Sequence, residues 1–247
     1  MSLFLPRAGS TTTGEPDQPT WGIPDALLGY VVSYCFAVIA GGVILSIGGW
    51  ADDPKDAPLG WTMAASIPIW VAFVGVSWFV ARTKGNGVVR DFHLAFAPVD
   101  IPLGIVAGVL AQFVLVNAIS WPILQLSGKT AEDLAKPAQD LADKVHGASG
   151  ALLFLFVVGV IVPIAEELFF RGLVYRAFEK RWDRWWALLL SSAFFGLTHF
   201  QLLQFLPLMA AGAVFGFLVL RTGRLAPAMF AHSAFNLSTA VVLLWTT

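Results

Sequence analysis

Seven apolar stretches, each near the length of a membrane-spanning helix, constrain the fold of this chain more than any other feature. They lie at about residues 24–49, 61–81, 100–125, 149–170, 185–200, 203–220 and 225–245. About 20 apolar residues cross the ~30 Å hydrocarbon core of a bilayer as a helix, in which the backbone polar groups bond to one another. The fifth and sixth stretches are short, and only FQLLQ separates them, which predicts a tight helical hairpin. We therefore expect an all-α, polytopic membrane protein, a bundle of about seven transmembrane helices.

Composition and charge agree with this expectation and narrow the partners. The chain has 247 residues, of which 57% are hydrophobic and 13% charged, whereas a soluble domain usually carries about 25% charged residues. The net charge of −1 argues against nucleic acid as a partner, so the expected environment is the lipid bilayer. Residues 21–247 are expected to form one membrane-embedded domain. Residues 1–20 are rich in Pro, Gly, Ser and Thr and lack the apolar core of a signal peptide, so we expect a disordered cytoplasmic tail.

The connecting segments divide the positive charges unequally between the two sides of the membrane. With the tail inside, the cytoplasmic side carries 11 of the 15 Lys and Arg, and the outer side carries the other four: Lys55, Lys129, Lys136 and Lys144. The positive-inside rule then places the N-terminus in the cytoplasm, and seven spans place the C-terminus outside. We expect an integral protein of the cell membrane.

Two further patterns concern packing and the outer surface. Residues 126–147 are polar, with apolar side chains near helical spacing, and predict an amphipathic helix on the outer side of the membrane. Glycines four residues apart allow close helix packing in two of the spans, at Gly104 and Gly108 and at Gly212 and Gly216.

A small set of polar side chains lies inside the apolar stretches, where ionisable groups are costly and by default mark a function. The set is Glu166 and Glu167 in the fourth stretch, His199 in the fifth, and His232 and Asn236 in the seventh. Taken singly, each has a structural explanation, such as an orienting ion pair, a satisfied core histidine or an interhelical hydrogen bond. Glu166 and His199 lie similarly far from the basic ends of antiparallel helices, which predicts a similar depth. Their occurrence together in three helices favours a functional site.

The spacing of these residues predicts how they meet. Glu167 and Arg171 are four residues apart, so they share a helix face and can form an ion pair. Adjacent residues diverge by ~100° around a helix, so Glu166 points elsewhere and is free to face the histidines. His232 and Asn236 are also four residues apart and can point into one cavity.

Three ordered motifs carry a resemblance to a known family. They are EExxxR beginning at Glu166, FxxxH ending at His199, and HxxxN beginning at His232. In order, spacing and placement on successive apolar helices they resemble the motifs of the CPBP family. This family comprises CAAX prenyl proteases and bacteriocin-processing intramembrane peptidases, and is also called the Abi family. The resemblance covers about residues 153–244, the expected catalytic core, whereas the first three helices carry no comparable signature.

The resemblance implies an intramembrane endopeptidase with the catalytic residues Glu166, Glu167, Arg171, His199, His232 and Asn236. Glu166 with His199 would activate water, and His232 with Asn236 would stabilise the oxyanion. A cavity within the membrane implies an amphiphilic substrate, a lipidated or membrane-anchored peptide. We favour this glutamic-type mechanism, which uses no cofactor.

One alternative mechanism and two alternative functions stay open. Glu166, His199 and His232 could hold Zn²⁺ with an open position for water, as in a metalloprotease, although the chain has no HExxH motif. A proton-coupled transporter or channel would also place Glu and His at membrane depth, but more often as two related halves, which this sequence does not show. A non-catalytic scaffold would not require all three motifs.

Overall fold

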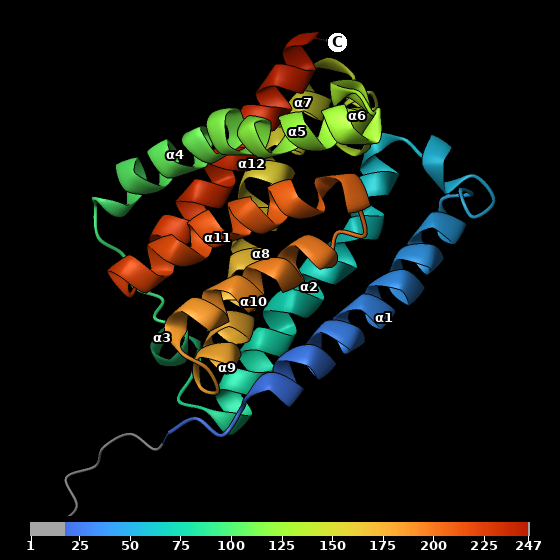
Figure 1. The fold of residues 1–247 in the computed structure, drawn as a ribbon. Helices are drawn as coiled ribbons and strands as arrows, with labels where there is room; N and C mark the ends of the chain where they lie inside the picture. Colours follow the sequence, from blue (N-terminus) through green and yellow to red (C-terminus); the bar gives the residue numbers. More distant parts are fainter. Residues whose placement is uncertain (1–17, 247) are drawn as a thin grey trace, which may run out of the picture.

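Helices make up the regular structure of the computed structural model, which describes residues 18–246 (Figure 1). No β-strand lies in that range, so the all-α prediction is confirmed. Most of the predicted tail, residues 1–17, lies outside the described residues. The α-helices are α1 (Ile23–Ile47), α2 (Leu59–Lys84), α3 (Val88–Asp91), α4 (Asp100–Leu110), α5 (Asn117–Ser127), α6 (Ala131–Ala142), α7 (Gly147–Phe156), α8 (Val162–Glu167), α9 (Tyr175–Glu179), α10 (Arg184–Leu197), α11 (Phe205–Thr222) and α12 (Ala226–Thr246). Between them lie the 3-10 turns η1 (Pro54–Asp56) and η5 (Leu202–Gln204) and the π-helical segments η2 (Ala111–Val116), η3 (Val157–Ile161) and η4 (Leu168–Val174).

Within residues 18–246, six continuous helical segments are long and apolar enough to cross a membrane: Ile23–Ile47, Leu59–Lys84, Asp100–Ser127, Gly147–Glu179, Leu202–Thr222 and Ala226–Trp245. They correspond to all of the predicted stretches except the fifth, which is α10. The 14 residues of α10 extend about 21 Å at ~1.5 Å per residue, less than the ~30 Å hydrocarbon core. The polytopic bundle of about seven helices is therefore confirmed, with one of them shorter than a full span.

The short α10 and the following α11 form the predicted hairpin. Asp183 begins α10 by accepting a hydrogen bond from the backbone N–H of Trp185 at 2.9 Å. The chain turns after α10 at Phe200, whose φ of +54° lies in the left-handed region. In Figure 1 the two helices run antiparallel in front of the helix that contains α8, while α1 packs along α2 at the edge of the bundle. The hairpin thus brings the second motif and α11 against the helix of the first motif.

Small residues let the helices around the centre approach closely, as the glycine spacing predicted. A Cβ on Gly108 of α4 would overlap the carbonyl oxygen of Ala231 on α12. A Cβ on Gly216 of α11 would lie 2.5 Å from Leu188 Cδ1 on α10. Ala231 directly precedes the histidine of the third motif, so the packing of α4 on α12 also helps to fix the position of that histidine.

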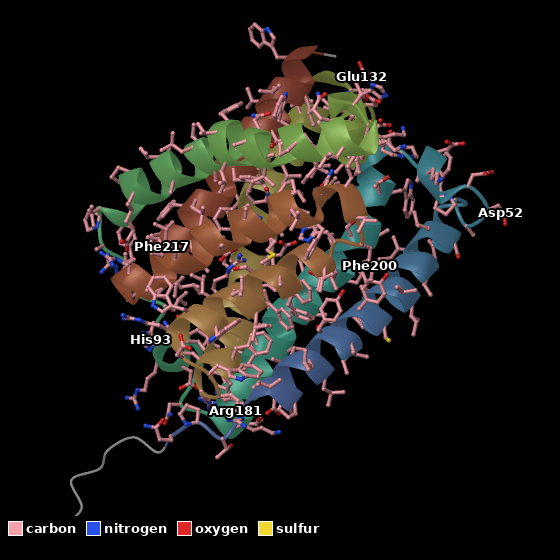
Figure 2. All side chains as sticks on the ribbon, viewed as in Figure 1. Asp52, His93, Glu132, Arg181, Phe200 and Phe217 are labelled. Carbon is pink, nitrogen blue, oxygen red and sulfur yellow. The ribbon has the colours of Figure 1, made fainter. Side chains whose placement is uncertain are left out.

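The bundle has two chemically different ends. Figure 2 shows Arg181 and His93 at one end, and Glu132 and Asp52 toward the other. At the first end the segment after α3 meets the end of α11, where His93 Nδ1 lies 3.0 Å from the carbonyl oxygen of Gly223. The two ends of the bundle could therefore face opposite sides of the membrane. Which end faces the cytoplasm stays a prediction.

The predicted amphipathic helix of the outer segment is α6. Its first turn is closed by a capping box, in which Asp133 N–H donates to Thr130 Oγ1 at 3.2 Å and Thr130 N–H donates to Asp133 Oδ2 at 2.9 Å. Its buried residue is Ala142, while Gln204 of η5 donates its side-chain amide to the carbonyl of Leu134 at 2.5 Å. The helix is therefore tied to the hairpin turn between α10 and α11.

Candidate active site

Two π-helical segments frame the glutamate pair. Glu166 and Glu167 end the six-residue α8, which lies between η3 and η4. A π turn contains an extra residue, is rare, and occurs mostly as a single turn at functional sites. The side chains on the two sides of each π turn are therefore rotated relative to a regular α-helix. Sequence analysis did not predict these segments.

The predicted ion pair between Glu167 and Arg171 is present and buried. Arg171 Nη1 lies 2.7 Å from Glu167 Oε1, and the two side chains are 2% and 0% exposed. Nη2 of the same guanidinium donates to the carbonyl of Gly212 on α11 at 2.9 Å. Its Cζ lies 4.5 Å from the ring centre of Phe195 and 5.3 Å from that of Phe215. The arginine is thus paired, hydrogen-bonded and enclosed by aromatic rings, which offsets the cost of burying its charge.

His232 lies between the two glutamates. Its Nδ1 is 2.8 Å from Glu167 Oε1, the oxygen that also accepts from Arg171. A carboxylate accepts, so the ring donates its Nδ1–H to Glu167, and Nε2 faces Glu166 Oε2 at 3.9 Å. The pairing of Glu167 with Arg171 is therefore part of a larger arrangement, in which the same carboxylate also holds the histidine of α12.

Glu166 differs from its neighbour in accepting no hydrogen bond within the described residues: Oε2 of both glutamates is buried without a partner, but Oε1 of Glu167 accepts from Arg171 and His232. The Glu166 side chain is 14% exposed, whereas that of Glu167 is 0% exposed. A carboxylate with unused lone pairs in a partly open site is able to take a proton from water.

His199 stands beside this arrangement without bonding to a glutamate. At the end of α10, its Nδ1 lies 2.8 Å from the carbonyl oxygen of Phe195. The Phe195 ring centre lies 4.8 Å from that of His199 and 5.8 Å from that of His232, so both imidazoles contact the same aromatic side chain. Within residues 18–246, no hydrogen bond or ion pair joins His199 to Glu166. Nε2 of His199 is the ring nitrogen that remains for a ligand.

Asn236 ties α12 to the helix of the glutamates. Its Nδ2 donates to the carbonyl of Val158 in η3 at 2.9 Å. The primary amide has a second N–H and a carbonyl oxygen, which this bond does not use. One donor of Asn236 is thus structural, and the other is available to a ligand.

The three zinc ligands of the alternative mechanism do not meet at one point in this geometry. Glu166 Oε2 and His232 Nε2 lie 3.9 Å apart and could share a ligand. His199 does not complete the set, because within residues 18–246 no three His, Cys, Asp or Glu side chains form a group that could hold a metal ion. The arrangement offers two of the three protein ligands that a catalytic zinc site usually has.

Helix α11 contributes two groups that the sequence analysis did not select. They are the carbonyl of Gly212, which accepts from Arg171, and the ring of Phe215, which stacks on His232 with centroids 4.9 Å apart and planes inclined by 18°. In the sequence, Gly212 was noted only as one of two glycines four residues apart that allow close helix packing. Phe215 had no signal of its own, because a phenylalanine in an apolar helix is typical of any membrane span.

Comparisons with known proteins find similarity to peptidases over the region of this site. Residues 148–238 match the family described as type II CAAX prenyl endopeptidase Rce1-like, and this range contains all six predicted site residues. The chain is 25% identical over 213 residues to the "Putative membrane peptidase YdiL" of Bacillus subtilis (strain 168), covering 85% of this chain and 84% of that protein. No solved structure matches the chain significantly.

Proposed function

We propose that this chain is an intramembrane protease of the CPBP family, and that it hydrolyses peptide bonds of membrane-anchored or lipidated peptides with Glu166 as general base; the similarities to an Rce1-like endopeptidase family and to a membrane peptidase support this proposal. The observation that carries this proposal is the difference between the two glutamates. Oε1 of Glu167 is held by Arg171 and His232, whereas the side chain of Glu166 accepts no hydrogen bond within the described residues and is 14% exposed. One carboxylate is committed to structure, and the other is available for proton transfer.

The reaction follows from these positions. Glu166 takes a proton from water while the water oxygen bonds to the scissile carbonyl carbon, and the carbonyl electrons move to its oxygen. His199 Nε2 orients the water. The second N–H of Asn236, together with Nε2–H of His232 when its ring carries both protons, donates to the oxyanion. The C–N bond then breaks, and the proton held by Glu166 passes to the leaving amine.

An apolar groove supports the choice of an amphiphilic substrate. The groove has a volume of about 510 Å³ and is lined by α2, η3 and α8, including Trp70, Trp78, Ile164 and Ala165. Ala165 directly precedes Glu166 in the chain, and the groove lies between two membrane-spanning segments. The apolar part of a substrate, whether a lipid chain or a transmembrane segment, would occupy this groove while its peptide bond lies at Glu166. Substrates that combine an apolar part with a peptide bond beside it include prenylated tails, bacteriocin or signal-peptide leaders and anti-sigma-type membrane proteins.

The proposal is tested by incubating purified protein in detergent with a membrane-anchored reporter peptide. We expect the wild type to cleave the reporter and Glu166→Ala to lose cleavage. A transporter, channel or scaffold would leave the reporter intact with either protein. Mapping the new termini after incubation with a membrane-protein library would identify the substrate class, and cleavage confined to soluble polar loops would contradict an amphiphilic substrate.

A further inference from the structure

We propose that Phe215 of α11 is a positioning residue for the reaction, because it holds the His232 ring between the two glutamates. This inference rests on the proposed function of the site. Phe215 is 0% exposed and lies face to face with His232, with ring centroids 4.9 Å apart. It contains no group that could react, so its contribution to the reaction would come through His232.

The hydrogen bond to Glu167 does not by itself fix the plane of His232. The χ2 torsion of histidine is broad, so the ring could rotate while Nδ1 stayed near the Glu167 carboxylate. Phe215 lies against one face of the imidazole at an inclination of 18°, and Phe195 meets the same ring at 86°. These two aromatic contacts select one ring orientation, the one in which Nε2 faces Glu166.

The same face of α11 also holds the partner of Glu167. Phe215 lies 5.3 Å from the Arg171 guanidinium, and the carbonyl of Gly212, three residues earlier, accepts a hydrogen bond from it. A Cβ on Gly212 would lie 3.1 Å from Arg171 Nη2 and 3.1 Å from Phe195 Cδ1, so this close approach favours glycine. One turn of α11 therefore orients both His232 and Arg171, the two residues that bind Glu167.

The proposal predicts a loss of turnover with little loss of substrate binding. Phe215 is absent from the lining of the apolar groove, so its replacement should leave KM nearly unchanged. Phe215→Leu keeps an apolar side chain but removes the flat ring face. Displacement of a catalytic group by about 1 Å can lower the rate by ~100-fold. We expect kcat to fall by about 10- to 100-fold on this basis.

The matched control is Phe73→Leu. Phe73 is likewise buried, at 4% exposure, and stacks on Phe169 at 4.4 Å, but makes no ring contact with His232 within the described residues. Both substitutions remove a buried aromatic ring and should lower stability. Phe73→Leu should keep the wild-type kcat per folded molecule.

A spectroscopic readout separates positioning from general loss of stability. The chain has four histidines, so selective ¹³C labelling of histidine gives four ring Cε1–H signals, and His232→Ala identifies the one of interest. In Phe215→Leu that signal should broaden because the ring is no longer held in one orientation, in addition to the shift from the lost ring current of Phe215, while in Phe73→Leu it should keep its position and width. If Phe215→Leu does not fold, Phe215→Met serves the same purpose, since methionine adapts to the space without an aromatic face.

The outcomes distinguish this inference from the proposed function. An active wild type, an inactive Glu166→Gln, and a low kcat with a broadened His232 signal in Phe215→Leu would support both. An active wild type and inactive Glu166→Gln, with wild-type kcat in Phe215→Leu, would overturn the positioning role alone. Equal kcat losses in Phe215→Leu and Phe73→Leu would also overturn it. Full activity in Glu166→Gln would overturn the proposed function itself.

Discussion

Removal of Arg171 should destabilise the protein far more than removal of a lysine in an ion pair of the same spacing. Arg171→Met leaves the Glu167 carboxylate, which is 0% exposed, with His232 as its remaining hydrogen-bond donor. It also removes the hydrogen bond from Arg171 to the Gly212 carbonyl, which keeps its bond within α11. Breaking a buried ion pair by removing one partner costs ~3–5 kcal/mol in total, and we expect a loss in that range.

The comparison is Lys136→Met on α6. Lys136 and Asp140 are also four residues apart, and their atoms are separated by a similar 2.8 Å, but their side chains are 69% and 56% exposed. Water solvates both charges after the substitution, so the free energy of unfolding should stay close to that of the wild type. The two variants differ in burial and not in the spacing of the pair.

The measurement is the free energy of unfolding of each variant in mixed micelles titrated with a denaturing detergent. The double variant Glu167→Gln/Arg171→Met should recover at least ~2 kcal/mol relative to Arg171→Met, because glutamine can still accept from His232 and carries no charge. A loss of stability in Arg171→Met as small as that in Lys136→Met would refute the conclusion that this pair is buried and mutually dependent.

Three further predictions concern the metal, the groove and the topology. Active purified protein should contain less than one equivalent of zinc and resist strong chelators; one equivalent of zinc that disappears in His199→Ala and His232→Ala would establish the alternative mechanism. Gly75→Phe should raise KM without a large loss of stability, because Gly75 lines the groove and a Cβ there meets no atom within 4 Å. The control is Gly42→Phe, which also projects into open space. Equal KM values in the two variants would contradict substrate binding in the groove. A reporter fused after Thr247 should be active outside the cytoplasm, and activity confined to the cytoplasm would contradict the predicted orientation.

Much of the fold was predictable because it depends on local properties of the chain. Apolar stretches of span length predicted the helices, and the four-residue spacing of Glu167 and Arg171 predicted their ion pair. The shortness of α10 was visible in its apolar stretch, which the sequence analysis identified as short. Thr130 and Asp133, with the helical spacing of the apolar residues that follow, agree with the surface helix α6.

The rest of the site depends on contacts between helices that no local pattern encodes. The bond between His232 and Glu167 joins residues that are 65 positions apart in the chain. The π turns η3 and η4 each contain one glycine, Gly159 and Gly172, and Pro163 follows η3, but single glycines and prolines are also frequent in regular membrane-spanning helices. The donor of Asn236 goes to Val158 in one of these turns, which could not be expected before η3 was known. Phe215 was not predicted because its function depends on what it contacts and not on its own chemistry.

The most direct test of the central claim compares Glu166→Gln with Glu167→Gln in the same cleavage assay. If Glu166 is the general base, Glu166→Gln should lower kcat by at least ~10²-fold and leave the free energy of unfolding nearly unchanged, because the Glu166 side chain accepts no hydrogen bond within residues 18–246. Glu167→Gln should lower stability, since it weakens the bonds to Arg171 and His232. Near-wild-type kcat in Glu166→Gln would contradict the account.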